Sequence, residues 1–287
     1  MKRLTIIFIL FASIINPVLA VPELHISFCD KNLKQERAVK QLLMSQVKYA
    51  NHNNFDKFIN TFDKSYKNSD GFDYEIYKKM VKEIWDSYDN IRYGMSIKDI
   101  KIDNNDATVI VDETSKANLT VTKKYSGKLK SNSNSVYYLK KIDDKWKVVS
   151  DEVLDETTYM LYGEANDLDI NLTVPTKITA NTDYTATLNF VPNKDVIAIA
   201  SITADKVEYP QKTAKEVFRT LPEDYILERI FTANSDNANE YVVASIGLTR
   251  TDLSDLSIKV SLSGFGYIIR RVNVVPVSIE EKTNEQN

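Results

Sequence analysis

The sequence predicts a chain of two structural classes, an α+β domain followed by an all-β sandwich. Apolar residues recur every three or four positions in the first third of the chain, which is the period of a helix. From about Tyr93 the apolar residues alternate with polar ones, which is the period of a strand. After Leu168, short alternating segments are separated by regular turn clusters, a pattern typical of a β-sandwich.

Three helical segments are expected before the first strand. The first carries Val39, Leu43 and Val47 on one face, at positions four residues apart. A polar break at residues 51–54 ends this helix and introduces a second, short one. A third helix follows the turn formers at residues 68–71. The helices of this domain are therefore expected to precede its sheet.

Two hairpins are expected to follow the helices. The turn at residues 103–106 consists of Asn and Asp, which tolerate left-handed backbone, and it separates two alternating apolar runs. A second turn at residues 142–145 precedes a strand that Trp146 begins. About seven short strands are then expected between residues 168 and 277.

Four segments follow from these patterns. We expect a signal peptide at 1–20, an α+β domain at 31–163, a β-sandwich at 167–278 and a disordered polar tail at 279–287. The boundary between the two domains is expected in the polar stretch at residues 163–166.

The first twenty residues are typical of a secretory signal. Two basic residues precede an apolar run at residues 4–15, Pro17 breaks it, and the small residue Ala20 suits a signal peptidase. We therefore predict cleavage after Ala20 and an exported protein, periplasmic or secreted. The apolar run is too short for a permanent membrane span, although retention as an anchor stays open.

Composition narrows the classes of function. The formal charge is −3, and loss of Lys2 and Arg3 with the signal would bring it to −5, with both signs interspersed. Such a surface suits neither nucleic acid nor an anionic membrane. Cys29 is the only cysteine, so the chain can form no intrachain disulfide. Because the sequence has no phosphate-binding loop and no metal-ligand spacing, no cofactor or metal is expected.

The first half resembles the NTF2-like superfamily, also called SnoaL-like. The residues that carry the resemblance are the broken helix at 38–62 and the turn and strand at 143–149, DDKWKVV. The resemblance covers residues 34–161 and implies a sheet bent into a cone, closed by helices. It also implies a homodimer through the open sheet face in many members, and enzymes among some. The second half resembles immunoglobulin-like modules of bacterial envelope proteins in strand count and alternation.

Few residues qualify as candidate site residues. Glu113 continues the face of Ala107, Val109 and Val111, and a buried carboxyl group there could act as a general base. The strand could already leave the sheet at this point, so an exposed edge acid is the favoured interpretation of Glu113. Asp151 and Glu152, beside the last strand of this domain, are weaker candidates for which the same two interpretations, buried base or exposed acid, stay open. The candidates for a ligand pocket are the aromatic residues Trp85, Tyr88 and Tyr93, for which plain core packing is the alternative.

The two histidines, His25 and His52, are not expected to be catalytic. His25 lies just after the predicted signal cut, and His52 lies in the polar break between helices. With so few histidines, hydrolases built on Ser-His or Cys-His pairs are nearly excluded.

These observations favour an exported, non-catalytic binding or scaffolding protein of the bacterial cell envelope. Its ligand or partner, a protein or a small molecule, is not legible in the sequence. Two alternatives stay open: a small-molecule isomerase or dehydratase using an acid such as Glu113, and a subunit of an envelope or secretion assembly.

Overall fold

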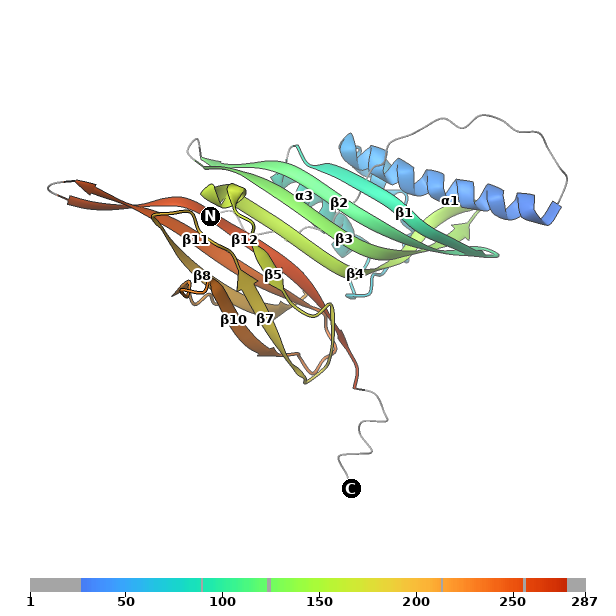
Figure 1. Ribbon diagram of the computed structural model, residues 1–287. Helices are drawn as coiled ribbons and strands as arrows, with labels where there is room; N and C mark the ends of the chain where they lie inside the picture. Colours follow the sequence, from blue (N-terminus) through green and yellow to red (C-terminus); the bar gives the residue numbers. More distant parts are fainter. Residues whose placement is uncertain (1–26, 89, 123–124, 213, 255–256, 278–287) are drawn as a thin grey trace, which may run out of the picture. The chain divides into compact units, whose positions relative to one another are not determined.

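A computed structural model describes residues 27–277 except 89, 123–124, 213 and 255–256 (Figure 1). The described residues form two compact units. Unit 1 contains the residues up to Ala117 together with Ser131–Leu154, and unit 2 contains Asn118–Lys130 and the residues from Asp155 onward. The predicted signal peptide and the predicted tail from residue 279 lie outside the described residues, so both stay predictions.

Unit 1 begins with three helices, α1 (Ser27–Asn51), α2 (Phe55–Ile59) and α3 (Tyr74–Ser87). They lie where helical spacing predicts them. The side chain of Asn54 accepts a hydrogen bond from the Lys57 amide, and that of Asp73 accepts from the Ile76 amide. These side chains satisfy amide groups that the first turn of a helix leaves unpaired. Of the described helices, none is long and apolar enough to cross a membrane.

The sheet of unit 1 has the order β1-β2-β3-β4. Its strands are β1 (Arg92–Asp103), β2 (Asp106–Thr122), β3 (Tyr125–Ile142) and β4 (Lys145–Gly163). The tight turns fall at the predicted positions, between β1 and β2 and between β3 and β4. On β2 every second side chain from Ala107 to Leu119 is buried, which gives the sheet one covered face.

Unit 2 contains two sheets. One has the order β4-β12-β11-β8-β9, and the other has the order β10-β7-β5. After the 3-10 turn Glu164–Asp167, the strands of this unit are β5 (Asn171–Thr173), β6 (Lys177–Thr179), β7 (Asp183–Asn189), β8 (Val196–Lys206), β9 (Arg219–Thr220), β10 (Ile226–Thr232), β11 (Glu240–Ser254) and β12 (Ser257–Val275). The short β6 pairs in parallel with the end of β12.

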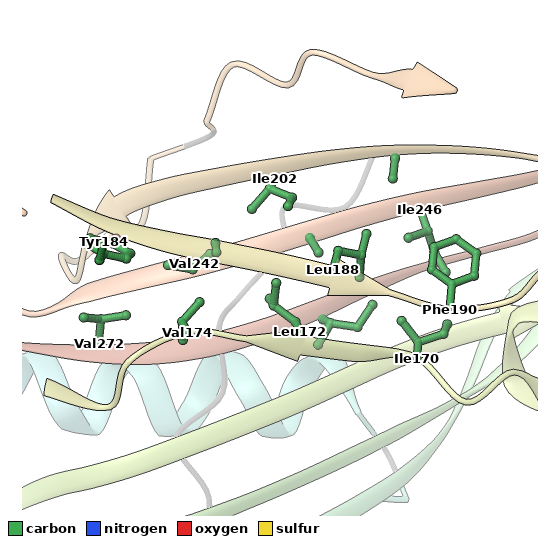
Figure 2. Close-up of a cluster of buried hydrophobic side chains, with 14 of the residues drawn as sticks. Ile170, Leu172, Val174, Tyr184, Leu188, Phe190, Ile202, Val242, Ile246 and Val272 are labelled. Carbon is green, nitrogen blue, oxygen red and sulfur yellow. The ribbon is translucent and has the colours of Figure 1, made fainter. Parts of the chain in front are cut away.

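The two sheets of unit 2 share a hydrophobic core. Figure 2 shows Leu172 and Leu188 from the small sheet with Ile202, Val242 and Ile246 from the large one. Leu172 and Leu188 follow the alternation of β5 and β7, which places one side chain in two inside. On β8 and β11 consecutive side chains are buried, so the pattern of those strands does not by itself identify the inner face. Burial of apolar area between the sheets is therefore the main force that holds unit 2 together.

The expected fold class, an α+β cone followed by an immunoglobulin-like sandwich, is wrong. The described chain is mostly β, with three α-helices against twelve strands. Strands β2, β3 and β4 are long, at 17, 18 and 19 residues. Residues 157–163 of β4 also pair with residues 264–270 of β12, so strand pairing continues across the position expected to separate two domains.

The physical reason lies in the polar residues on the covered face of the long strands. Ser115, Ser131 and Ser135 are all buried, yet serine interrupts an apolar alternation as a turn residue would. The apolar pattern therefore breaks inside β2 and β3, although the hydrogen-bonded ladder does not. Pairing between β4 and β12 links residues about 100 positions apart, which no local period can indicate.

Candidate functional site

A concentration of buried polar groups lies on the covered face of the unit 1 sheet, around the candidate Glu113. Glu113 is only 4% exposed, and it lies on the same face of β2 as Val109 and Val111. Its placement therefore follows the alternation of the strand, and the favoured interpretation of an exposed edge acid is wrong.

Hydroxyl groups from the adjacent strand β3 occupy both carboxylate oxygens of Glu113. Ser135 donates to Oε2 at 2.5 Å and Ser133 donates to the same oxygen at 3.2 Å. Tyr137 donates to Oε1 at 2.9 Å. The three donors are two residues apart, so the alternation of β3 places them on one face of the strand, toward Glu113.

Burial raises the pKa of the Glu113 carboxyl group from its ordinary 4.5 to about 8. Loss of water is the largest cause, because a charged carboxylate is poorly solvated inside the protein. The hydroxyls of Ser135, Tyr137 and Ser133 oppose this rise, and the charge of Asp151 adds to it. Glu113 is therefore expected to be mostly protonated at pH 7.

A second buried acid, Asp151 on β4, faces the same interior. The hydroxyl of Tyr66 donates a hydrogen bond to its Oδ1. Burial raises the pKa of both Tyr66 and Tyr77, and the charge of Asp151 raises them further. The charge of Glu113 also affects Tyr77 of α3, which places this helix over the same face of the sheet. Asp151 is thus buried, which the sequence left open.

One buried hydroxyl beside this group has no partner in the described part of the chain. Ser115 lies two residues beyond Glu113 on β2, is 0% exposed, and its Oγ makes no hydrogen bond. Tyr93 on β1 is its neighbour in register, and Met95 is the neighbour of Glu113. Because both neighbours are also buried, the face around Glu113 is covered on the β1 side.

Of the three aromatic residues predicted for a ligand pocket, Trp85 and Tyr93 form a hydrogen-bonded pair, and Tyr88 lies at the end of a helix. Trp85 Nε1 donates to the Tyr93 hydroxyl at 2.9 Å. The Trp85 ring packs against Phe55 and Phe58, with ring centroids 5.9 and 5.5 Å away. Tyr88 follows α3 directly, and its amide donates to the Ile84 carbonyl. These contacts explain Trp85 and Tyr93 by packing between α2, α3 and β1, while a ligand pocket there stays a prediction.

Replacement of Tyr93 by phenylalanine is expected to lower the stability of unit 1 by about 1 kcal/mol, because Trp85 Nε1 loses its acceptor. Urea unfolding followed by tryptophan fluorescence measures the change. The control is Tyr49→Phe, whose hydroxyl makes no hydrogen bond among the described residues and whose loss should change stability by less than about 0.5 kcal/mol. Equal stability of the two variants would contradict the role given to the Trp85–Tyr93 bond.

The other residues considered for chemistry do not join this group. His52 is exposed just after α1, and its Nδ1 lies 2.7 Å from the Lys48 carbonyl, where it ends the helix. Cys29 lies in the first turns of α1, and His25 lies outside the described residues. Within the described ranges, no cluster of three or more His, Cys, Asp or Glu side chains could hold a metal ion.

Sequence reasoning missed most of the partners of Glu113. Tyr137 is 24 positions away, and Tyr66 is 85 positions from its partner Asp151. Only strand pairing and the packing of the segment before α3 bring them together, so no local period could find them. One signal was available: Ser131, Ser133 and Ser135 alternate, as residues on one face of a strand do.

Comparisons with known proteins identify no family. No family model matches the chain, and no curated protein matches it. Solved structures with local likeness include Bd1075 of Bdellovibrio bacteriovorus, with 17% identity over 43% of this chain and 41% of that one, at a TM-score of 0.35. Kfla4162 of Kribbella flavida has 10% identity over 42% of this chain and 90% of its own, at 0.39.

A third likeness is to AclR of Streptomyces galilaeus, with 14% identity over 40% of this chain and 86% of its own, at a TM-score of 0.30. The matched region spans less than half of Bd1075. TM-scores this low assign neither a fold nor an activity to the chain.

Proposed function

We propose that the chain is an exported, non-catalytic binding or scaffolding protein of the bacterial cell envelope. The observation that supports the proposal is the enclosure of Glu113, the best acid candidate of the sequence. Both of its oxygens accept hydrogen bonds from hydroxyls of its own sheet. A general base must reach the proton that it removes. A buried carboxyl group that bonds only to side chains of the neighbouring strand instead fixes how the two strands pack.

The proposal includes two elements carried by sequence alone. Export rests on residues 1–20, and a distant relationship to the NTF2-like superfamily rests on the order of elements and the Trp146 motif. Many members of that superfamily only bind or hold partners, which agrees with an enclosed interior.

One observation favours a second candidate, a small-molecule isomerase or dehydratase with Glu113 as its base. A carboxyl group with a pKa of about 8 beside a tyrosine hydroxyl has the chemistry that proton transfer at neutral pH requires. This candidate needs an interior that solvent and substrate can enter. Accessibility of the interior therefore separates the two functions.

A thiol placed in the interior tests accessibility without a known ligand. In a Cys29→Ser background, Ser115→Cys introduces a single, nearly isosteric thiol beside Glu113. We expect it to react with a thiol reagent at least about 1,000-fold more slowly than Ser96→Cys, because a buried thiol reacts only through local opening. Ser96 is the matched control, since it is a serine of the same sheet that lies on β1 and is exposed. Rates in urea correct for the intrinsic reactivity of each thiol.

Labelling of Ser115→Cys within about tenfold of the exposed control would overturn the enclosed interior. It would then support the isomerase or dehydratase candidate. Circular dichroism must show that both variants are folded before their rates are compared.

A further inference from the structure

Unit 2 has a recess at the free edge of β8, outside everything assigned to the Glu113 region. The recess has a volume of about 140 Å³. Its walls come from β8, from the segment that precedes β9 and from β10. The lining residues are Ser201, Ile202, Val217, Arg219, Leu227, Glu228 and Arg229.

The recess lies where the β8 ladder stops. β9 pairs with β8 only at Ile199 and Ala200. One step further, the Val217 amide donates to the Ser201 side chain at 3.0 Å in place of the β8 backbone. The chain before β9 therefore leaves the sheet at this point, and among the described residues no strand pairs with the next outward positions of β8.

Along β8, backbone carbonyl groups point alternately toward β11 and toward the free edge of the strand. The Ala198 carbonyl points away from β11, because it accepts from the Leu221 amide. Ile202 and Ala204 must point the same way, since a strand turns every second residue to the same side. Arg229 Nη1 donates to the Ile202 carbonyl at 2.5 Å, whereas the Ala204 backbone has no outward partner among the described residues. A side chain thus substitutes for a missing strand.

The recess is positively charged and has apolar rims. Arg219 makes no ion pair in the part of the chain that the structure describes. Arg229 donates a hydrogen bond to a backbone carbonyl, and its guanidinium lies over the Phe231 ring, 5.1 Å from the ring centroid. The single lining carboxylate, Glu228, accepts from Thr187 on the neighbouring strand. Val217 and Phe218 are 50% and 45% exposed beside the recess. Two guanidinium groups against one engaged carboxylate leave a net positive site.

We propose that this edge of β8 binds an extended acidic peptide segment of a partner protein, which adds as a strand in the line of β9. Backbone bonds to Ala204 would supply register, while Arg229 keeps its hydrogen bond to the Ile202 carbonyl. Carboxylates of the peptide would pair with Arg219 and with the remaining N–H groups of Arg229. Apolar side chains between the carboxylates would cover Val217 and Phe218. The inference rests on the proposed binding function, and it adds the kind of partner, an acidic peptide, that the β8 edge would bind.

Charge decides between this occupant and a second copy of the chain. Symmetric pairing of two β8 edges would bring Arg219 and Arg229 of each copy against the same residues of the other. Like charges in direct opposition destabilise an interface, whereas carboxylates of a foreign strand neutralise them.

The test uses the full mature chain and nine-residue synthetic peptides, with binding followed by fluorescence anisotropy at low salt. The probe alternates valine with glutamate, and its control alternates valine with lysine. A third peptide repeats the probe with alternate amides methylated, so that it keeps the charge but cannot add to a strand. We expect the probe to bind, the lysine peptide not to bind, and methylation to weaken binding at least about tenfold.

Two charge-reversal variants complete the design. Arg219→Glu is expected to weaken binding of the probe about tenfold, whereas Lys177→Glu, an exposed cation on β6, should leave it unchanged. The proposal would be overturned if the lysine peptide or the methylated peptide bound as tightly as the probe. It would also be overturned if Arg219→Glu bound the probe as tightly as the wild type, or if the probe did not bind at all. If the peptides do not bind as expected but the Ser115→Cys thiol is protected, the peptide site is refuted and the proposed function stands. If the thiol is labelled rapidly but the peptides bind as expected, the enclosed interior is refuted and the peptide site stands.

Discussion

Replacement of Glu113 by glutamine is expected to remove most of the pH dependence of unit 1 stability between about pH 4.5 and pH 8. The folded protein holds a proton on Glu113 up to a pKa of about 8, whereas the unfolded chain releases it near the ordinary 4.5. Unfolding therefore releases a proton in this window, and wild-type stability falls as pH rises through it. A separation of this size corresponds to about 5 kcal/mol between the two ends of the window.

Four other groups of unit 1 whose pKa is displaced, Asp63, Asp112, Tyr66 and Tyr77, titrate outside this window. Asp63 and Asp112 have pKa values below the ordinary 3.8, held there by hydrogen bonds from Ser65 and Lys98, so their contributions disappear only in acid. Burial raises the pKa of Tyr66 and Tyr77 well above 10, so these phenols matter only in strong alkali. Unlike these four groups, Glu113 titrates near neutral pH, so we expect the fall in stability there to disappear with the Glu113 carboxyl group.

Urea unfolding at pH 5, 6.5 and 8 measures this effect through tryptophan fluorescence. Both tryptophans of the chain, Trp85 and Trp146, belong to unit 1, so the signal reports on the unit that holds Glu113. The matched control is Asp112→Asn, because Asp112 lies next to Glu113 on β2 but is part of the outer face, with Lys98. Parallel pH profiles of the wild type and Glu113→Gln would refute the buried, protonated state of Glu113.

The sequence predicted the helices and tight turns because each depends on neighbouring residues. The helical spacing of Val39, Leu43 and Val47 and the cap at Asp73 need no distant partner. The parity of its strand also made Glu113 a candidate for the covered face, although the sequence favoured an exposed edge acid there. Interactions between neighbouring residues were therefore enough to predict the helices, the tight turns and one candidate residue of the site.

The fold class and the partners of Glu113 depend on contacts between distant segments. Ser131 and Ser135 are buried only because β3 lies between β2 and β4, and the donor Tyr137 is useful to Glu113 only in that order. The edge recess of β8 likewise arises because β9 is two residues long and β10 belongs to the other sheet. None of these pairings leaves a period in the sequence.

Replacement of Leu188 by alanine is expected to destabilise unit 2 by about 2 to 5 kcal/mol. Leu188 is 0% exposed on β7, the middle strand of the small sheet, and Figure 2 shows it with Leu172 of β5. Its neighbours in register are Leu172 on β5 and Leu227 on β10. A three-stranded sheet gains little stability by itself and depends on a packed apolar face. Removal of the central side chain leaves a cavity between the two sheets that rigid strands cannot close.

Urea unfolding followed by far-ultraviolet circular dichroism measures this loss, because unit 2 has no tryptophan to report on it. The control is Thr185→Ala, on the same strand but on its exposed face, for which a change within about 0.5 kcal/mol is expected. The two positions lie on opposite faces of β7, so the comparison tests the buried face of the strand. If both variants lost less than about 1 kcal/mol, burial between the sheets would not be what holds β5, β7 and β10 in place.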